Sequence, residues 1–413
     1  MKQHGLAAIV ALLMGTAAAA QDLPTPPDLP STALAVAWID KDPAVVEARR
    51  ALAAAGHGAA ALAAGNHEWT AKASTQRRQV GGVGNSTEWS VGVERGIRIG
   101  GKAGLDRQLG EADIEIGRAR VGEARHEVAR ALSVLWLDLQ AAHGAQRLLK
   151  EQLSFAETNL AAVDKRKRAG DASALDLSIA QTDLAEVRRQ ASQADATLAK
   201  ARAKLKLRFP EASVAAAILS DPAEPQWPAA RWNERILAEA DPVKIAEGQL
   251  RRAELAASRT RAEKVSDPTV GVFTSNEAFR NERVIGISVS IPFGGAAREP
   301  RLQQALQEVE VARAALDRVR QGIEIEIAET HAEAVGSVER WRIAERGADA
   351  ARESARLTQR AYTLGELDLQ SLLLVRRQSV DALRAAAEAR ADALRSNYRL
   401  LIDAHLIWDL AND

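Results

Sequence analysis

Two stretches of the chain repeat one pattern of apolar and polar residues: Trp89-Ser-Val-Gly-Val-Glu-Arg-Gly-Ile-Arg-Ile-Gly-Gly101 and Arg283-Val-Ile-Gly-Ile-Ser-Val-Ser-Ile-Pro-Phe-Gly-Gly295. Glycine occupies the fourth and the twelfth position of both stretches, at an offset of 194 residues. Further along, Gly170 and Gly365 are separated by 195 residues. Matched glycines separated by nearly the same number of residues indicate that the chain contains an internal duplication.

Both stretches alternate apolar and polar residues with a period of two, which predicts β-strands. A partner strand precedes each of them, over residues 69–76 and from Val270 onward. Alternation over about ten residues is typical of a transmembrane β-strand. The alternative is a half-buried sheet in a soluble protein. Arg95 lies on the apolar face of the first stretch. In a transmembrane strand, a charge at this position is tolerable only near the membrane–water interface.

Residues 102–168 show a helical pattern that only isolated glycines interrupt, and residues 296–364 form a second helical segment of similar length. Each is ~100 Å long if continuous, at ~1.5 Å per residue, which is more than a globular core needs. The returning arms carry heptad rows, which predict close helix packing with a left-handed supercoil. The rows are Leu177, Leu184, Ala191, Leu198 and Leu205, and Leu372, Ala386, Ala393 and Leu400.

The composition excludes several classes of protein. The 413 residues include 55 Lys and Arg, 55 Asp and Glu and no Cys. A net charge of zero provides no basic field to hold nucleic acid. The absence of Cys excludes thiol nucleophiles, disulfides and thiolate zinc sites. Apolar residues make up 46% of the chain but aromatic residues only 4%, which is typical of long, closely packed helices.

The first residues combine a short basic start, an apolar core over 6–14 and small residues at 18–20, which predicts a secretory signal peptide at 1–20. An uncleaved anchor is the alternative. We predict a first structural repeat at 21–208 and a Pro-rich connector at 209–233. The second repeat follows at 234–413. Each repeat is expected to contain a helix, two strands and a long helical hairpin.

Four strands cannot close a barrel, because the smallest known barrels have about eight. An open sheet would leave unpaired edges in lipid. A membrane barrel built from this chain would therefore have to be shared between subunits, and three copies would give twelve strands.

The hairpin turns carry the most specific local motif. The first reads Gly170-Asp-Ala-Ser-Ala-Leu-Asp-Leu177 and the second Gly365-Glu-Leu-Asp-Leu-Gln-Ser-Leu372, with Tyr362 three residues before the glycine. With the duplication, these residues resemble the TolC family of outer-membrane efflux proteins, also called outer membrane factors. The length and the missing lipidation Cys are similar to its cobalt–zinc–cadmium efflux branch. The second turn has Ser371 where the family often has Asp.

The resemblance implies a mainly α fold with a membrane β part. Three subunits would share a twelve-stranded barrel in the cell outer membrane and extend into the periplasm as an α-helical barrel. The homotrimer would bind outer-membrane lipid, a periplasmic adaptor (membrane fusion) protein and, through that adaptor, an inner-membrane efflux pump. Its function would be that of a passive gated conduit from periplasm to exterior, with heavy-metal cations as one class of cargo.

The resemblance also implies two sets of site residues at the turns. The hairpin tips that contact the adaptor would be Ala169, Gly170, Asp171, Leu364, Gly365 and Glu366. The periplasmic gate would comprise Asp176, Tyr362 and Asp368, which we expect to pair with basic residues such as Lys167 or Arg168. From the sequence alone, the glycines fit a left-handed helix end, and Ser173, Asp176 and Asp368 fit helix caps. Capping and gating are compatible.

Other kinds of site find little support. The seven His are never paired at helical spacing, so we expect no metal site, no cofactor and no catalytic centre. Gly81-Gly-Val-Gly84 reads as a hairpin loop rather than a phosphate cradle. Basic residues flank the two hairpin loops and would either contact lipid headgroups or remain solvated: Arg77, Arg78, Arg280 and Arg283. The alternative function is a periplasmic coiled-coil scaffold without channel activity.

Overall fold

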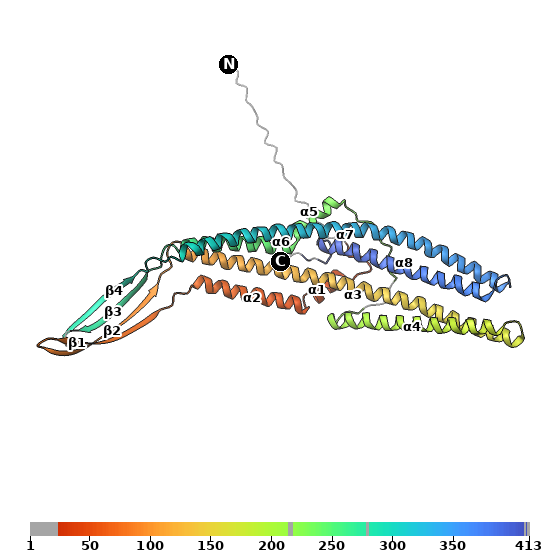
Figure 1. The fold of residues 1–413 in the computed structure, drawn as a ribbon, viewed down its shortest axis with the longest axis horizontal. Helices are drawn as coiled ribbons and strands as arrows, with labels where there is room; N and C mark the ends of the chain where they lie inside the picture. Colours follow the sequence, from red (N-terminus) through yellow and green to blue (C-terminus); the bar gives the residue numbers. More distant parts are fainter. Residues whose placement is uncertain (1–23, 214–217, 278–280, 409, 411–413) are drawn as a thin grey trace, which may run out of the picture.

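The chain folds into an elongated bundle of helices with a sheet at one end (Figure 1). The computed structural model describes residues 24–213, 218–277, 281–408 and 410. The predicted signal peptide and Arg280 lie outside these ranges. None of the helices within the ranges combines the length and the hydropathy that crossing a bilayer requires.

The helices and strands of the two halves follow one another in the same order. The first half contains α1 (Thr32–Ile39), α2 (Pro43–Ala64), β1 (Thr70–Val80), β2 (Gly84–Gly96), α3 (Lys102–Ala169) and α4 (Ala174–Arg208). The second contains α5 (Ala229–Glu239), α6 (Asp241–Ala262), β3 (Thr269–Glu277), β4 (Glu282–Ser290), α7 (Arg298–Thr363) and α8 (Leu369–Asp403). Helix α5 begins within the range assigned to the connector.

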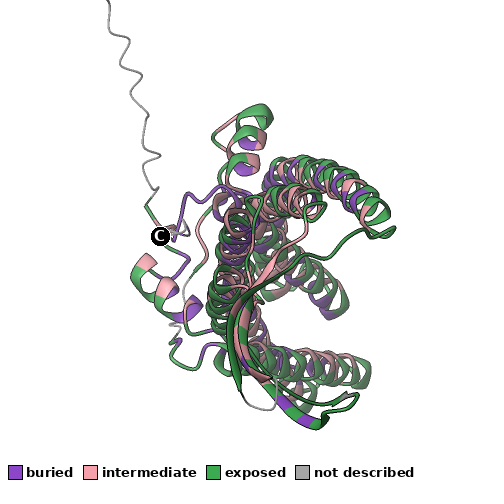
Figure 2. Ribbon diagram, turned by 90° about the vertical axis from the view of Figure 1, so that its left-hand side faces the viewer, coloured by how far each residue is buried: buried purple, intermediate pink, exposed green. Residues whose placement is uncertain are grey.

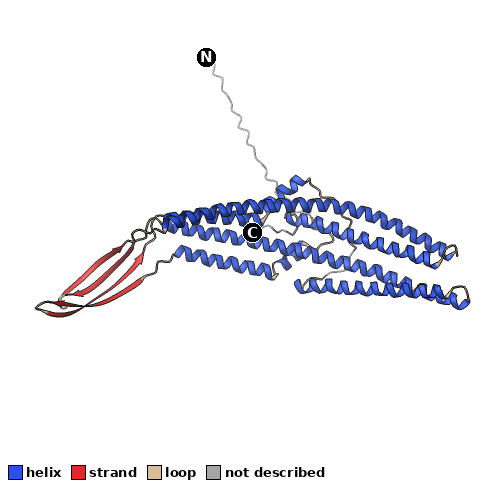
Figure 3. Cartoon of the chain, in the orientation of Figure 1, coloured by secondary structure: helices blue, strands red, loops and turns tan. Residues whose placement is uncertain are grey.

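Two very long helices set the shape of the molecule, as predicted. Helix α3 has 68 residues and α7 has 66, so each runs for about 100 Å at ~1.5 Å per residue. Helices α2 and α4 follow one another along α3, and α6 and α8 do the same along α7 (Figure 3). Both hairpin turns therefore lie at the end opposite the sheet.

The heptad rows face the inside of the bundle, which confirms the predicted packing. Most of their members are buried, and Leu177 is half-buried. In α4 the buried members are Leu184, Ala191, Leu198 and Leu205, and in α8 they are Leu372, Ala386, Ala393 and Leu400. The small Ala side chains allow the neighbouring helices to approach closely.

The largest apolar core lies at mid-length, where the start of the described chain and its last residues pack against α3. Trp38, Leu132, Trp136 and Trp408 belong to this core, which we call the mid-length belt. The indole N–H of Trp136 donates to the backbone oxygen of Asp28 at 2.7 Å. Figure 2 shows buried residues gathered between the helices, whereas the sheet is mostly exposed or intermediate. The sequence analysis did not predict this belt.

The four strands form one antiparallel sheet in the order β1-β2-β3-β4. All four strands were predicted, and residues 81–83 connect β1 to β2 as a hairpin loop. Strand β2 was expected to continue to Ile99 but ends at Gly96. The reason is Pro268, whose carbonyl accepts from the Ile97 N–H at 2.8 Å but which has no N–H to extend the ladder.

Candidate functional site

The sheet has one apolar face and one polar face. Residues paired across the strands project from the same face, so the register assigns every side chain to a face. The apolar face continues beyond β2 and β4 and is exposed: Ile285 is 79% exposed, Ile287 75% and Phe293 94%. Its other exposed apolar members are Trp69, Trp89, Val91, Val93, Val272 and Val289. An exposed patch of this extent indicates contact with a membrane or a partner.

The polar face carries paired charges. Lys72 contacts Glu94 at 2.6 Å, and Arg78 contacts Glu88 at 3.1 Å. Glu88 is only 1% exposed and also accepts from Gln76 Nε2 at 2.8 Å. These carboxylates are therefore matched by cations or hydrogen-bond donors on the same face.

Arg95, which seemed misplaced on the apolar face, is held by local partners. Its Nε donates to the backbone oxygen of His67 at 2.9 Å. Its guanidinium carbon lies 5.7 Å from the centre of the Trp69 ring. This cation–π contact and hydrogen bond fix the charge at the end of the sheet that adjoins the helices.

A buried ionic contact joins the sheet to the helices at this end. Lys102, the first residue of α3, is 3% exposed. Its ammonium donates to Asp267 Oδ1 at 2.7 Å and to the backbone oxygen of Val265 at 2.6 Å. Asp267 also accepts from the Ile99 N–H at 3.0 Å. No local sequence signal predicts this contact, because Lys102 and Asp267 are 165 residues apart.

The tip of the first hairpin, between α3 and α4, is built by a glycine and a capping box. Gly170 adopts φ +87°, a left-handed conformation that ends α3. Ser173 Oγ accepts from the Asp176 N–H at 3.0 Å, and Asp176 Oδ2 accepts from the Ser173 N–H at 2.9 Å. The predicted caps are present, and Ala169, Gly170 and Asp171 are exposed.

The tip of the second hairpin, between α7 and α8, is similar but has a simpler cap. Gly365 adopts φ +79°, and Asp368 Oδ1 accepts from the Ser371 N–H at 2.7 Å. With Ser at position 371, no acidic side chain reaches back as Asp176 does in the first hairpin. Leu364, Gly365 and Glu366 are exposed, as an adaptor contact would require.

The two tips contact each other through Arg166 and Tyr362. Arg166 Nη1 donates to the Tyr362 hydroxyl at 3.0 Å, and its guanidinium carbon lies 5.7 Å from the ring centre. The expectation that Lys167 or Arg168 would provide the basic partner was wrong for Tyr362. Arg168 instead pairs within its own helix with Asp164 at 2.6 Å, because an i, i+4 partner lies on the same helix face.

Asp176 and Asp368 are both exposed or half-exposed acids at the tips. Hydrogen bonds from Ser173 hold the pKa of Asp176 below its usual range, and the Ser371 N–H does the same for the pKa of Asp368. The negative charge of Asp176 opposes this lowering at Asp368. The structure thus brings the three predicted gate residues to one end of the molecule, and each acid also caps a helix.

Comparison with known proteins agrees with this geometry. No family model matches the chain. The nickel-cobalt-cadmium resistance protein NccC of Alcaligenes xylosoxydans xylosoxydans is 25% identical over 234 residues, which cover 55% of this chain and 52% of NccC. The outer membrane efflux protein BepC of Brucella suis is 29% identical over 116 residues, 28% of this chain and 25% of BepC. The chain thus spans about half, or less, of the length of these curated relatives.

A solved structure extends the likeness to nearly the whole chain. The outer-membrane channel OprN superimposes with a TM-score of 0.76 over 92% of this chain and 91% of OprN, at 19% sequence identity. That likeness is one of fold. The chain therefore has a TolC-like fold, and its sequence is similar to those of outer-membrane efflux proteins.

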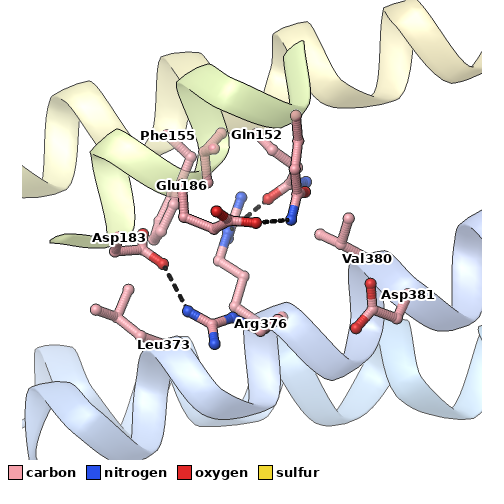
Figure 4. Close-up of a pocket in the computed structure, with 11 residues that line it drawn as sticks. Gln152, Phe155, Asp183, Glu186, Leu373, Arg376, Val380 and Asp381 are labelled. Carbon is pink, nitrogen blue, oxygen red and sulfur yellow. Dashed lines mark hydrogen bonds and ion pairs between the residues drawn. The ribbon is translucent and has the colours of Figure 1, made fainter. Parts of the chain in front are cut away.

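A second contact between the hairpins lies further from the tips (Figure 4). Arg376 of α8 reaches into a cavity of about 30 Å³ between α3 and α4. Its guanidinium carbon lies 3.2 Å from the centre of the Phe155 ring, and Nε donates to Gln152 Oε1 at 3.0 Å. Burial lowers the pKa of Arg376 to about 10. The sequence analysis did not identify this residue.

Among the described residues, no group of side chains could hold a metal ion. His126 and His405 lie closest together, with ring centres 5.3 Å apart. Burial lowers the pKa of His126 to about 3 and that of His405 to about 4, so both are neutral at physiological pH. His126 instead approaches the backbone oxygen of Ile402 at 3.3 Å.

Proposed function

We propose that this chain is the outer-membrane channel of a tripartite efflux system. It would be a passive, gated conduit from periplasm to exterior, without enzymatic activity. One observation carries the proposal: the sheet has one exposed apolar face, and among the described residues its edge strands β1 and β4 each pair with a neighbouring strand on one side only. Three copies would satisfy both edges by closing a twelve-stranded barrel, with the apolar face toward lipid.

The helical hairpins would then form the periplasmic part of the duct. Their exposed tips would contact a periplasmic adaptor, and through it an inner-membrane pump that supplies the energy. Residues 1–20 would serve as the signal peptide that directs export. The resistance protein NccC supports divalent heavy-metal cations as the cargo. A duct of this kind would not hold its cargo tightly.

The gate would lie at the hairpin tips. Arg166 and Tyr362 hold the second hairpin against the first, and Asp368 and Asp176 fix the backbone of each tip. Movement of the second hairpin away from the first would break the contact of Arg166 with Tyr362. A partner that binds the exposed tips could therefore open the duct.

Reconstitution tests this proposal directly. The purified protein should be a detergent-extracted trimer by light scattering and should form channels in planar bilayers. Carbonate washing of membranes distinguishes the channel from the alternative function. A periplasmic scaffold would be released by the wash, and a membrane channel would not. A stable monomer that retains its β-structure would contradict the shared sheet.

A further inference from the structure

Two arginines project from the apolar face of the sheet. Arg77 pairs across the strands with Thr87, two residues beyond the level of Trp89. Arg283 pairs with Asn276, which in turn pairs with Trp89. By this register both side chains share the face of Trp89, and both are exposed. They lie beside the hairpin loops, at the end of the sheet farthest from the helices.

The partners of these arginines differ from those of the cations on the other face. On the polar face, Lys72 contacts Glu94 and Arg78 contacts Glu88. On the apolar face, Arg95 is held by Trp69 and by the backbone of His67. Within the described part of the chain, the guanidinium groups of Arg77 and Arg283 form no ion pair or side-chain hydrogen bond. The apolar face of the sheet therefore carries two positive charges, at Arg77 and Arg283, that no described acidic side chain neutralises. The cations of the polar face, by contrast, are paired.

A phosphorylated lipid headgroup has the chemistry to complete this arrangement. Its acyl chains match the apolar face, and its phosphate oxygens match the planar donor fork of a guanidinium. The long stem of Arg lets the charge reach the headgroup level while the methylenes stay against apolar surface. Trp89 adds an aromatic ring at the same level, where such rings border the hydrocarbon region.

We propose that Arg77 and Arg283 bind phosphate groups of membrane lipid at the outer rim of the sheet. This inference rests on the proposed function, which places the apolar face in the outer membrane. Arg77 is on edge strand β1 and Arg283 on edge strand β4, ~14 Å apart across three strand spacings. In a closed trimer the β4 edge of one copy meets the β1 edge of the next. Each lipid site would then lie at a subunit seam and draw one arginine from each copy.

The test measures lipid retained by the purified trimer. Protein in neutral detergent is mixed with diphosphorylated lipid A or with the same lipid after dephosphorylation, and bound fatty acid per chain is measured after gel filtration. The wild type should retain the phosphorylated lipid preferentially. R77Q/R283Q should lose roughly fivefold or more of that retention, the scale of a lost bidentate charge-assisted contact. R77K/R283K should recover part of it.

Lys72→Gln is the matched control, because it removes a cation from the polar face of the same strand and should leave retention unchanged. Wild-type retention in R77Q/R283Q, or an equal loss in the Lys72 variant, would overturn the proposal. Complete displacement by excess inorganic phosphate would also overturn it, by showing a site for free phosphate. Lipid retention is measured independently of conductance. A trimer that binds lipid but does not conduct would therefore contradict the proposed channel function and leave the lipid site standing.

Discussion

The ring of Phe273 lies over Gly286 on the neighbouring strand, so closely that a Cβ atom on Gly286 would come within 2.5 Å of Phe273 Cζ. Phe273 is also the cross-strand partner of Gly92, whose Cβ would meet the Phe273 Cβ at 2.9 Å. These two glycines occupy equivalent positions in the duplicated stretches. One aromatic side chain thus uses the space that both glycines leave open on the otherwise polar face.

We predict that Gly286→Ala destabilises the sheet by about 1–3 kcal/mol, the cost of overpacking a filled site. Adding Phe273→Ala should restore much of this loss, because the clash requires both side chains. Denaturant unfolding of the purified protein would measure both effects. Gly322→Ala is the control, since its Cβ would meet no atom within 4 Å in α7, and it should not destabilise. Additive losses in the double variant would contradict a direct clash.

Gly170→Val and Gly365→Val should uncouple export while leaving membrane insertion intact. Both glycines have φ near +80°, a conformation in which a β-branched residue is strongly disfavoured. The strain would distort the exposed tips, at the opposite end of the bundle from the sheet. Cell survival under cargo stress and membrane fractionation provide the two measurements. If both variants insert and export normally, the tips are not the adaptor contact.

Arg166→Ala should raise single-channel conductance more than Tyr362→Phe does. The alanine removes both the hydrogen bond and the cation–π contact, whereas phenylalanine keeps the ring. Each exposed contact is worth ~0.5–1 kcal/mol, and three subunits multiply it to a few kcal/mol. Asp368→Ala combined with Tyr362→Phe should act in the same direction. Arg168→Ala is the matched control, because Arg168 pairs within α3. If all variants had the same conductance, Arg166, Tyr362 and Asp368 would have a structural role and no role in the gate.

Glu123→Gln should stabilise the protein above neutral pH and have little effect in acid. Burial, followed by the charge of Glu127, raises the pKa of Glu123 from 4.5 to about 7. The folded state therefore holds a proton that the unfolded state releases, so stability falls as pH rises from about 4.5 through 7. Gln removes this loss. Thermal unfolding at pH 4 and pH 8 measures it, with exposed Glu151→Gln as control. If Glu123→Gln raised the stability equally at pH 4 and pH 8, the titration of Glu123 would not be the cause.

Local sequence signals predicted the elements that depend on neighbouring residues. Period-two alternation located all four strands, and the turn glycines with Ser173, Asp176 and Asp368 located the tips and their caps. Capping was predictable because donor and acceptor are three residues apart. The gate roles, the trimer and the adaptor contact stay predictions, since a single chain does not test them.

Contacts between distant segments were not predictable in the same way. Tyr362 was expected to meet Lys167 or Arg168, but Arg166 is its partner because the packing of two helices decides which side chain faces the ring. Lys102 with Asp267 and Arg376 with Phe155 were missed for the same reason. Each joins residues more than 160 positions apart, where periodicity specifies a helix face but not its neighbour.

The mid-length belt has a mechanical consequence for the hairpins. Beyond Trp136, which the belt buries, α3 continues for another 33 residues to Ala169, or ~50 Å. A helix held at that point behaves as a lever with its fulcrum at the belt, so a tilt of ~5° would move the tip by ~4 Å. Such a displacement exceeds the reach of the hydrogen bond between Arg166 and Tyr362. Small rotations at the belt would thus be amplified at the tips, and a rigid α3, which extends 34 residues from Trp136 back to Lys102, would carry the sheet end a similar distance the opposite way.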